Sequence, residues 1–121
     1  MPFIKSTSIV TDIAITVPGL TGGTNGKVVR VDGENTVTDA ANTDSVSQLN
    51  AVLIKMGGIY YASGVVSGFT SLAAGAPYFL GSDGSIVSTP PSPTTSVIAL
   101  YLGFAINSTD IIFRPGIPIS G

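Results

Sequence analysis

Short apolar runs separated by glycine and proline turns make up most of this 121-residue chain. From Ile9 to Val17 the odd positions are apolar except for Thr11, while Asp12 and Thr16 fall on the other face. Further apolar runs cover 27–31, 49–56, 97–106 and 111–113. These runs have the length of strands, and no window of about 11 residues keeps the period of a helix. The pattern predicts about eight to ten short strands, a number that forms a small antiparallel sandwich or a tulip-like barrel.

The turns between the runs have sequences typical of hairpins. Asp32-Gly33 is expected to return the strand at 27–31 onto 36–38, because Asp-Gly favours tight turns with positive φ. Gly57-Gly58 is expected to join 49–56 to a strand that begins at Ile59. The sequence therefore predicts an all-β fold built largely of local hairpins.

Three segments are expected to lie outside this regular pattern. Met1 to Ser8 is predicted to be an extended N-terminal arm, and residues 9–121 a single β domain. Leu20 to Gly26 holds three glycines in seven residues and predicts a mobile loop. The polar stretch 39–48 predicts either a loop or one helical turn with Asp44 as its N-cap.

Composition narrows the classes of function. Charged residues make up 10% of the chain, against roughly 25% in an average soluble domain. Five scattered basic residues and a net charge of −2 provide no basic surface for nucleic acid. The mean hydropathy is +0.50, yet the longest uncharged apolar run has ten residues and a membrane helix needs about 20. We expect no membrane partner, and expect the apolar surface to be covered by other protein chains.

Candidate chemistry is sparse because histidine and cysteine are absent. Asp32 and Glu34 flank a glycine and could form a carboxylate pair for acid–base or metal chemistry, but a solvated turn is the favoured interpretation. Asp39 and Asp44 lack the spacing of a calcium loop. Lys27 follows a glycine-rich run as in a phosphate loop, but a strand follows it where a helix is needed. We expect no catalytic residues, no metal site and no cofactor.

The aromatic side chains allow two interpretations. Tyrosines could stack on a glycan, although packing in a core or an interface is favoured. Tyr60 and Tyr61 are adjacent in a predicted strand, so they are expected to point to opposite faces. Pro90 to Pro93 could be a proline-rich ligand, but a stiff loop between strands is favoured.

One stretch of the chain is similar to a known viral module. It consists of Leu72 to Leu80, Gly84-Ser85-Ile86-Val87, Pro90-Pro91 and Leu102 to Asp110, with Gly26 to Gly33 upstream. This order resembles a module common in virion proteins of tailed bacteriophages, found in tail-fibre and appendage proteins. Similar small β domains serve as head decoration (cement) proteins. Phe79 stands where a second tyrosine is common, and the family brings no catalytic residues.

The resemblance implies a structural role in the virion. The favoured function is a capsid decoration protein that stabilises capsomer junctions by apolar contacts and strand addition. The alternatives are a short tail-fibre or appendage subunit and, less favoured, a glycan-binding module. The expected partners are further copies of the chain, as a homotrimer, and the major capsid protein or other virion proteins. Synthesis is expected in the host cytoplasm and final location on the head surface or a tail appendage. The expected interface residues lie in the arm and the apolar strands: Phe3, Ile4, Ile9, Tyr60, Tyr61, Tyr78, Phe79 and Phe104.

Overall fold

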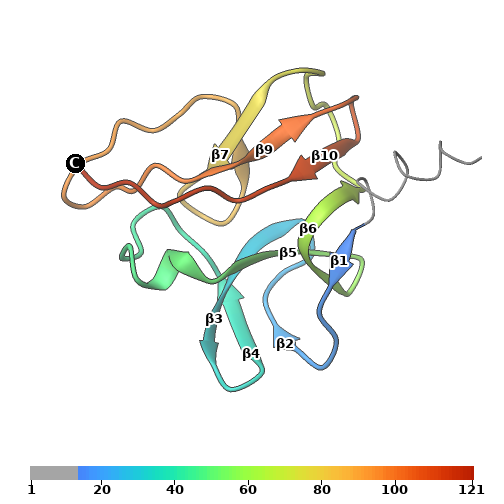
Figure 1. Cartoon of the computed structure of the whole chain (residues 1–121), viewed down its shortest axis with the longest axis horizontal. Helices are drawn as coiled ribbons and strands as arrows, with labels where there is room; N and C mark the ends of the chain where they lie inside the picture. The colour runs from blue at the N-terminus through green and yellow to red at the C-terminus, as the bar shows by residue number, and fades with distance from the viewer. Residues whose placement is uncertain (1–13) are drawn as a thin grey trace, which may run out of the picture.

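The computed structural model describes residues 14–121, which form an all-β fold (Figure 1). Ten strands occur in this part of the chain, and its helical structure is one 3-10 turn, η1 (Gln48–Asn50). No helix among the described residues has the length and apolar character needed to cross a membrane. The strands are β1 (Ile15–Thr16), β2 (Thr21–Gly22), β3 (Lys27–Gly33), β4 (Thr36–Asp39), β5 (Val52–Met56), β6 (Ile59–Ser67), β7 (Pro77–Leu80), β8 (Ile86–Val87), β9 (Tyr101–Ala105) and β10 (Asp110–Phe113). The predicted arm, with Phe3, Ile4 and Ile9, lies outside the described residues.

The strands are hydrogen-bonded in one open path, β2-β4-β3-β5-β6-β10-β9-β7-β8, with β1 also paired to β6. The predicted all-β class is therefore confirmed, whereas a sandwich or a closed barrel is not confirmed. Pairing is antiparallel except between β2 and β4, where Thr21 and Gly22 run parallel to Thr36 and Val37. This parallel pair departs from the prediction, because Pro18-Gly19 turns the chain so that β2 approaches β4 in the same direction.

Strand β6 belongs to two parts of the sheet. Its first residues pair with β5, and residues from Gly64 onward pair with β10. Ala62 packs on the outer side of the sheet and Val66 packs in the core, although both have even numbers. The alternation thus changes phase between them, where Gly64 has a φ of 95° that favours glycine. We call β1–β5 with the start of β6 the first half-sheet, and the end of β6 with β7–β10 the second half-sheet.

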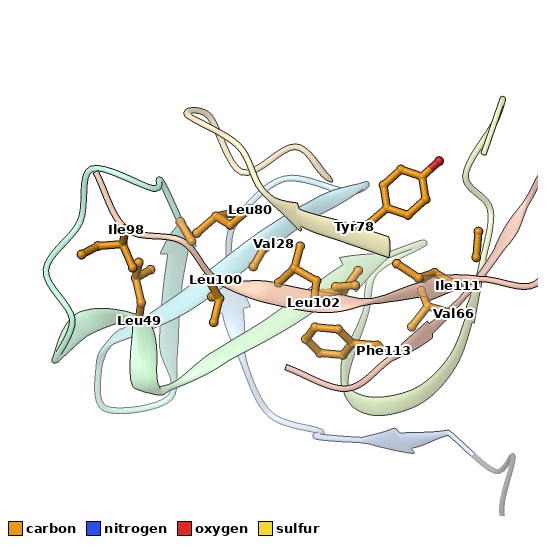
Figure 2. Packing of buried hydrophobic residues seen from close by; sticks show 13 residues of the cluster. Val28, Leu49, Val66, Tyr78, Leu80, Ile98, Leu100, Leu102, Ile111 and Phe113 are labelled. Atoms are coloured by element: carbon orange, nitrogen blue, oxygen red, sulfur yellow. The ribbon is translucent and has the colours of Figure 1, made fainter. Parts of the chain in front are cut away.

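The main core lies between the two half-sheets (Figure 2). Val28 and Ile54 come from the first half-sheet, while Leu80, Leu102 and Phe113 come from the second. Backbone hydrogen bonds also join the half-sheets far from β6. The Val28 amide donates to the Gly84 carbonyl at 2.7 Å, and the Ile98 amide donates to the Asn42 carbonyl at 2.7 Å. The open sheet is therefore curled around one core.

The predicted hairpins are present, with one correction. Gly57 and Gly58, with φ values of 59° and 80°, connect β5 to β6 as expected. The β3–β4 turn is instead centred on Glu34 and Asn35, since Asn35 has a φ of 59° while Asp32-Gly33 forms the end of β3. Asparagine tolerates this left-handed conformation, which accounts for the displaced turn.

The polar stretch before β5 contains the one helical turn, but Asp44 does not cap it. The Asp44 Oδ2 atom accepts hydrogen bonds from the Arg30 Nε atom at 3.0 Å and from the Ala41 amide at 2.9 Å. Ser45 and Gln48 instead bond reciprocally, each side chain accepting from the other's backbone amide. The N-cap position of η1 is Ser47, whose side chain makes no capping hydrogen bond, so the Ser45–Gln48 pair joins the preceding loop to the start of η1.

Residues 17–22 cover the outer side of the first half-sheet. Val17 and Leu20 pack there on a second apolar cluster that contains Val29, Leu53 and Tyr60. The glycine-rich loop predicted at 20–26 includes β2, and its backbone carbonyls accept hydrogen bonds from side chains of β5 and β6. One face of the first half-sheet thus meets the core, and the other meets this covering segment.

Candidate interaction face

The second half-sheet carries a row of apolar side chains on the side away from the core. Cross-strand pairing joins Phe79 to Val87 and Tyr101, and joins Ile112 to Phe104 and Val65. Paired residues project from the same face of a sheet, so these side chains share one surface. We call this surface the outer face; its members are Val65, Phe79, Val87, Tyr101, Phe104 and Ile112.

Strict alternation along the strands places these side chains outside. Tyr78 and Leu80 flank Phe79 in β7, and Ile111 and Phe113 flank Ile112 in β10; all four belong to the core. Because successive side chains of a strand point to opposite faces, Phe79 and Ile112 point away from the core. Their cross-strand partners on β9, Tyr101 and Phe104, project from the same side of the sheet.

A bulge in β9 brings two aromatic residues onto the outer face. The pairing of β7 with β9 shifts register between Tyr78 and Phe79, opposite Gly103. Gly103 has a φ of 145°, and a Cβ atom there would overlap the Ile112 carbonyl oxygen. The bulge places both Tyr101 and Phe104 outward, and the Tyr101 ring meets Phe79 edge to face at 5.8 Å between ring centroids.

Exposed apolar residues concentrate on β9 and the segments beside it. Seven large hydrophobic side chains are exposed in the described part of the chain, and four of them lie here: Tyr101, Ile106, Ile117 and Ile119. The chain after β10 runs beside residues 99–101, with Ile119 paired to Ala99. Among the described residues, the clusters of buried apolar side chains are the core and the one beneath residues 17–22. On the outer face itself, Tyr101 is 37% exposed and Ile112 is 8% exposed, while Val65, Phe79, Val87 and Phe104 are half-buried, so residues 14–121 cover this apolar face only in part.

Charge is distributed unevenly between the two halves of the sequence. Of the twelve charged residues (five basic and seven acidic), only Asp83, Asp110 and Arg114 lie beyond residue 55. Charged residues are depleted at the centres of protein interfaces. The half of the chain that builds the outer face is thus the half with the composition of an interface.

Two carboxylates near the second half-sheet have lowered pKa values. Hydrogen bonds from the Ser85 side chain and backbone, with a further contribution from Lys27, lower the pKa of Asp83 to about 2. Hydrogen bonds from Asn107, Ser67 and Thr109 lower the pKa of Asp110. Both groups are held as anions in hairpin turns, which is a structural role for each of them.

The predicted interface residues fall into two groups in the structure. Phe79 and Phe104 lie on the outer face, half-buried. Tyr60 and Tyr78 are 7% and 6% exposed and pack within the chain; the Tyr60 hydroxyl donates to the Gly22 carbonyl, and the Tyr78 hydroxyl accepts from the Ala73 amide. Tyr61 packs against the core on the opposite face from Tyr60, which confirms the predicted alternation.

Tyr101 was not among the predicted interface residues, although it lies on the outer face and is 37% exposed. The signal that identifies it is its position next to Leu102, which is fully buried in the core. A strand residue adjacent to a fully buried one points to the other face. The uneven charge distribution is the second signal, and it is visible in the sequence itself.

The remaining candidate residues have structural partners. Asp32 accepts a hydrogen bond from the Thr36 hydroxyl beside the β3–β4 turn, and Asp39 accepts from the Thr24 amide and hydroxyl. Lys27 pairs with Asp83 at 3.3 Å. No three acidic side chains converge in residues 14–121 in a way that could hold a metal ion.

An open groove of about 990 Å³ lies between residues 68–72 and β8. Met56, Phe69 and Tyr78 contribute apolar surface to it, and serine and threonine residues from both sides line the rest. Its lining contains no charged side chain, so the groove offers neither a general base nor a charged anchor for a ligand.

Comparisons with known proteins found no match. No family model, curated protein or solved structure is significantly similar to the chain.

Proposed function

We propose that this chain is a non-enzymatic structural subunit that assembles through the outer face, and that it serves as a capsid decoration (cement) protein of a tailed bacteriophage. The observation that carries the assembly role is the apolar, charge-poor outer face of the second half-sheet. Faces of this kind mark protein–protein contacts. The assignment to a virion rests on the resemblance of roughly residues 22–113 to the phage module.

A decoration protein must fold stably and bind neighbours without chemistry. The two half-sheets pack on one core, which supports a rigid subunit. The outer face would bury its aromatic side chains against a further copy of the chain, and the assembled unit would bind at a capsomer junction. An N-terminal arm of eight residues reaches up to roughly 27 Å when extended, enough to add a strand to an adjacent subunit. The resemblance favours a homotrimer as the assembled unit.

A short tail-fibre or appendage subunit is the second candidate, because the module is common in such proteins. Copy number per virion separates the two: hundreds of copies correspond to a decoration protein, and at most a few dozen to an appendage. Neither role requires enzymatic activity. Replacing Asp32 and Glu34 with alanine should therefore leave assembly and capsid binding intact.

A matched pair of substitutions tests the use of the outer face. Ile106 and Ile59 are each 46% exposed; Ile106 follows the buried Ala105 at the end of β9, and Ile59 begins β6 in the first half-sheet. Ile106→Lys is expected to weaken self-association and capsid binding, while Ile59→Lys leaves both unchanged. Mass measurement in solution and co-sedimentation with undecorated capsids provide the two readouts. Equal effects of the two substitutions would contradict the proposed role of this face.

A further inference from the structure

Asp110 begins β10 and Arg114 directly follows it, with the Arg114 amide still bonded to the Leu102 carbonyl of β9, so the two form an ordered pair of opposite charges along one row. Ile111 and Phe113 point into the core, so Asp110, Ile112 and Arg114 point outward in the order negative, apolar, positive. Asp110 and Arg114 are two of the three charged residues beyond residue 55. Two of the three charges in this half of the chain therefore lie on one row, and the third, Asp83, lies in the β7–β8 turn.

The two charges are too far apart to pair within one chain. Four residues of an extended strand span about 13 Å, and an ion pair needs an N–O distance of about 4 Å or less. Asp110 is held in its turn by Asn107 and Thr109, and Arg114 is exposed. Each charge is thus available to a group that approaches the outer face from outside.

We infer that two copies of this chain pack outer face to outer face across a two-fold axis near Ile112, with Asp110 of each copy beside Arg114 of the other. The inference deepens the proposed function and rests on the use of the outer face in self-association.

The order of the charges selects the direction of packing. When two sheets stack with their β10 strands antiparallel, each Asp110 meets the other copy's Arg114 and Ile112 meets Ile112. When the strands are parallel, Asp110 meets Asp110 and Arg114 meets Arg114, which is repulsive. A two-fold axis perpendicular to β10 produces the antiparallel arrangement, and such isologous contacts require a self-complementary surface. The row on β10 has this property.

The surroundings of Ile112 suit a second copy as the occupant. Ile112 is itself only 8% exposed and forms the flat centre of the face, the half-buried Val65 and Phe104 flank it on the neighbouring strands, and Phe79 with Tyr101 continues the apolar row. Stacked sheets lie about 10 Å apart with interdigitated side chains, so these residues would bury one another across the axis. Because one face supplies both the apolar row and both charges, no foreign partner is needed to neutralise it.

A two-fold contact joins an even number of chains. It produces a dimer if it is the single contact between copies, and a hexamer if the proposed trimer also forms through other surfaces. A protein that exists only as a trimer has no such contact, so the mass in solution distinguishes this inference from the trimer itself.

Charge reversals test the pairing directly. Asp110→Lys and Arg114→Glu each replace two attractive contacts per interface with two repulsive ones. Each variant alone is expected to raise the dissociation constant at least tenfold, which is about 1.4 kcal/mol. An equimolar mixture of the two variants restores attraction at both contacts, and is expected to form mixed pairs with nearly the original affinity. Sedimentation equilibrium and native mass spectrometry measure both quantities.

Two controls keep this test decisive. Glu34→Lys makes the same change in net charge as Asp110→Lys on an exposed turn of the first half-sheet, and should leave association unchanged. If Asp110→Lys unfolds because its turn is lost, Arg114→Glu is assayed alone at rising salt. Salt should strengthen the association of this variant by screening repulsion, and weaken that of the original protein.

The outcomes separate the inference from the proposed function. Recovery in the mixture, or opposite salt dependence, supports the two-fold pairing. Unchanged association of both reversed variants overturns the pairing, while a loss with Ile106→Lys would still support assembly through the outer face. If Ile106→Lys also has no effect, the proposed function fails with it.

Discussion

The ion pair between Arg30 and Asp44 is predicted to attach the loop before β5 to the first half-sheet. Arg30 lies in β3, and its Nε atom is 3.0 Å from the Asp44 Oδ2 atom; the two side chains are 19% and 20% exposed. The same oxygen accepts the Ala41 amide at 2.9 Å. The loop that Asp44 organises supplies Leu49 to the core, so the pair connects surface charge to core packing.

The free energies follow from the bonds that each substitution removes. Arg30→Ala removes one charge-assisted hydrogen bond, worth about 1.5–3 kcal/mol, and partial exposure places the cost near 1–2 kcal/mol. Asp44→Ala removes the same bond and leaves the Ala41 amide without this acceptor, which adds about 1 kcal/mol. The double variant should cost about as much as Asp44→Ala plus a small packing loss, so the coupling energy is about 1 kcal/mol.

Urea unfolding of the four proteins, followed by circular dichroism, measures these values. Lys27→Ala is the matched control, because Lys27 and Asp83 form a more exposed pair at 3.3 Å and should contribute less than about 1 kcal/mol. The reasoning is refuted if Arg30→Ala costs as much as Asp44→Ala, or if the two substitutions are simply additive.

Three further predictions concern single positions. Gly103→Ala should lower stability by about 3 kcal/mol or prevent folding, because the new methyl group overlaps the backbone of β10; Gly75→Ala, with a φ of 81° and open space around it, should cost only about 1 kcal/mol in thermal melts. Asp83→Asn should remove part of the acid sensitivity of the fold. Ser85 holds the pKa of Asp83 at about 2, below the ordinary 3.8 of an aspartate, so its carboxylate stabilises the fold above about pH 4 and this contribution is lost as the pH falls toward 2. Titration that shows identical losses for both proteins between pH 4 and 2 would contradict this assignment. Tyr60→Phe should lower stability by about 1 kcal/mol and increase amide hydrogen exchange in residues 17–22, because it removes the hydrogen bond to the Gly22 carbonyl. Unchanged exchange in residues 17–22 would contradict this prediction.

Most local elements of this fold could be predicted because their signals are local. Gly57-Gly58 forms a hairpin turn as expected, and alternation places Tyr60 and Tyr61 on opposite faces. The β3–β4 turn was predicted two positions too early because two adjacent dipeptides, Asp32-Gly33 and Glu34-Asn35, can both form turns. Local propensity does not decide between them; the register of β3 against β4 does.

The arrangement of the sheet depends on tertiary contacts that no short pattern contains. The phase change at Gly64 allows β6 to belong to both half-sheets. A glycine within a strand indicates a bulge, but it does not indicate which strands will pair on either side of it. The parallel pairing of β2 with β4 likewise brings together residues 15 positions apart through a covering segment. Both features depend on which segment covers which apolar surface, and no short stretch of the sequence contains that information.

The residues of the candidate site were likewise predicted only in part, because their exposure depends on tertiary contacts. Phe79 and Phe104 were predicted as interface residues and lie on the outer face, while Tyr60 and Tyr78 lie within the chain. Whether an aromatic strand residue is covered depends on a distant segment: residues 17–22 cover Tyr60, whereas the described chain provides no such cover for Tyr101. Hydrophobicity alone does not distinguish these cases.

The position of β6 in both half-sheets has a consequence for synthesis. A ribosome releases β1–β6 before it makes residues 98–113, whose side chains Leu100, Leu102 and Phe113 fill the other side of the core. At a synthesis rate of 5–20 residues per second, the inner side of the first half-sheet stays uncovered for roughly 2–9 s, until residues 98–113 have been made. A chain cut after β6 would keep its hairpins but present Val28 and Ile54 to solvent. Such a fragment should aggregate rather than persist as half a domain, so a nascent chain of this protein depends on its final strands for solubility.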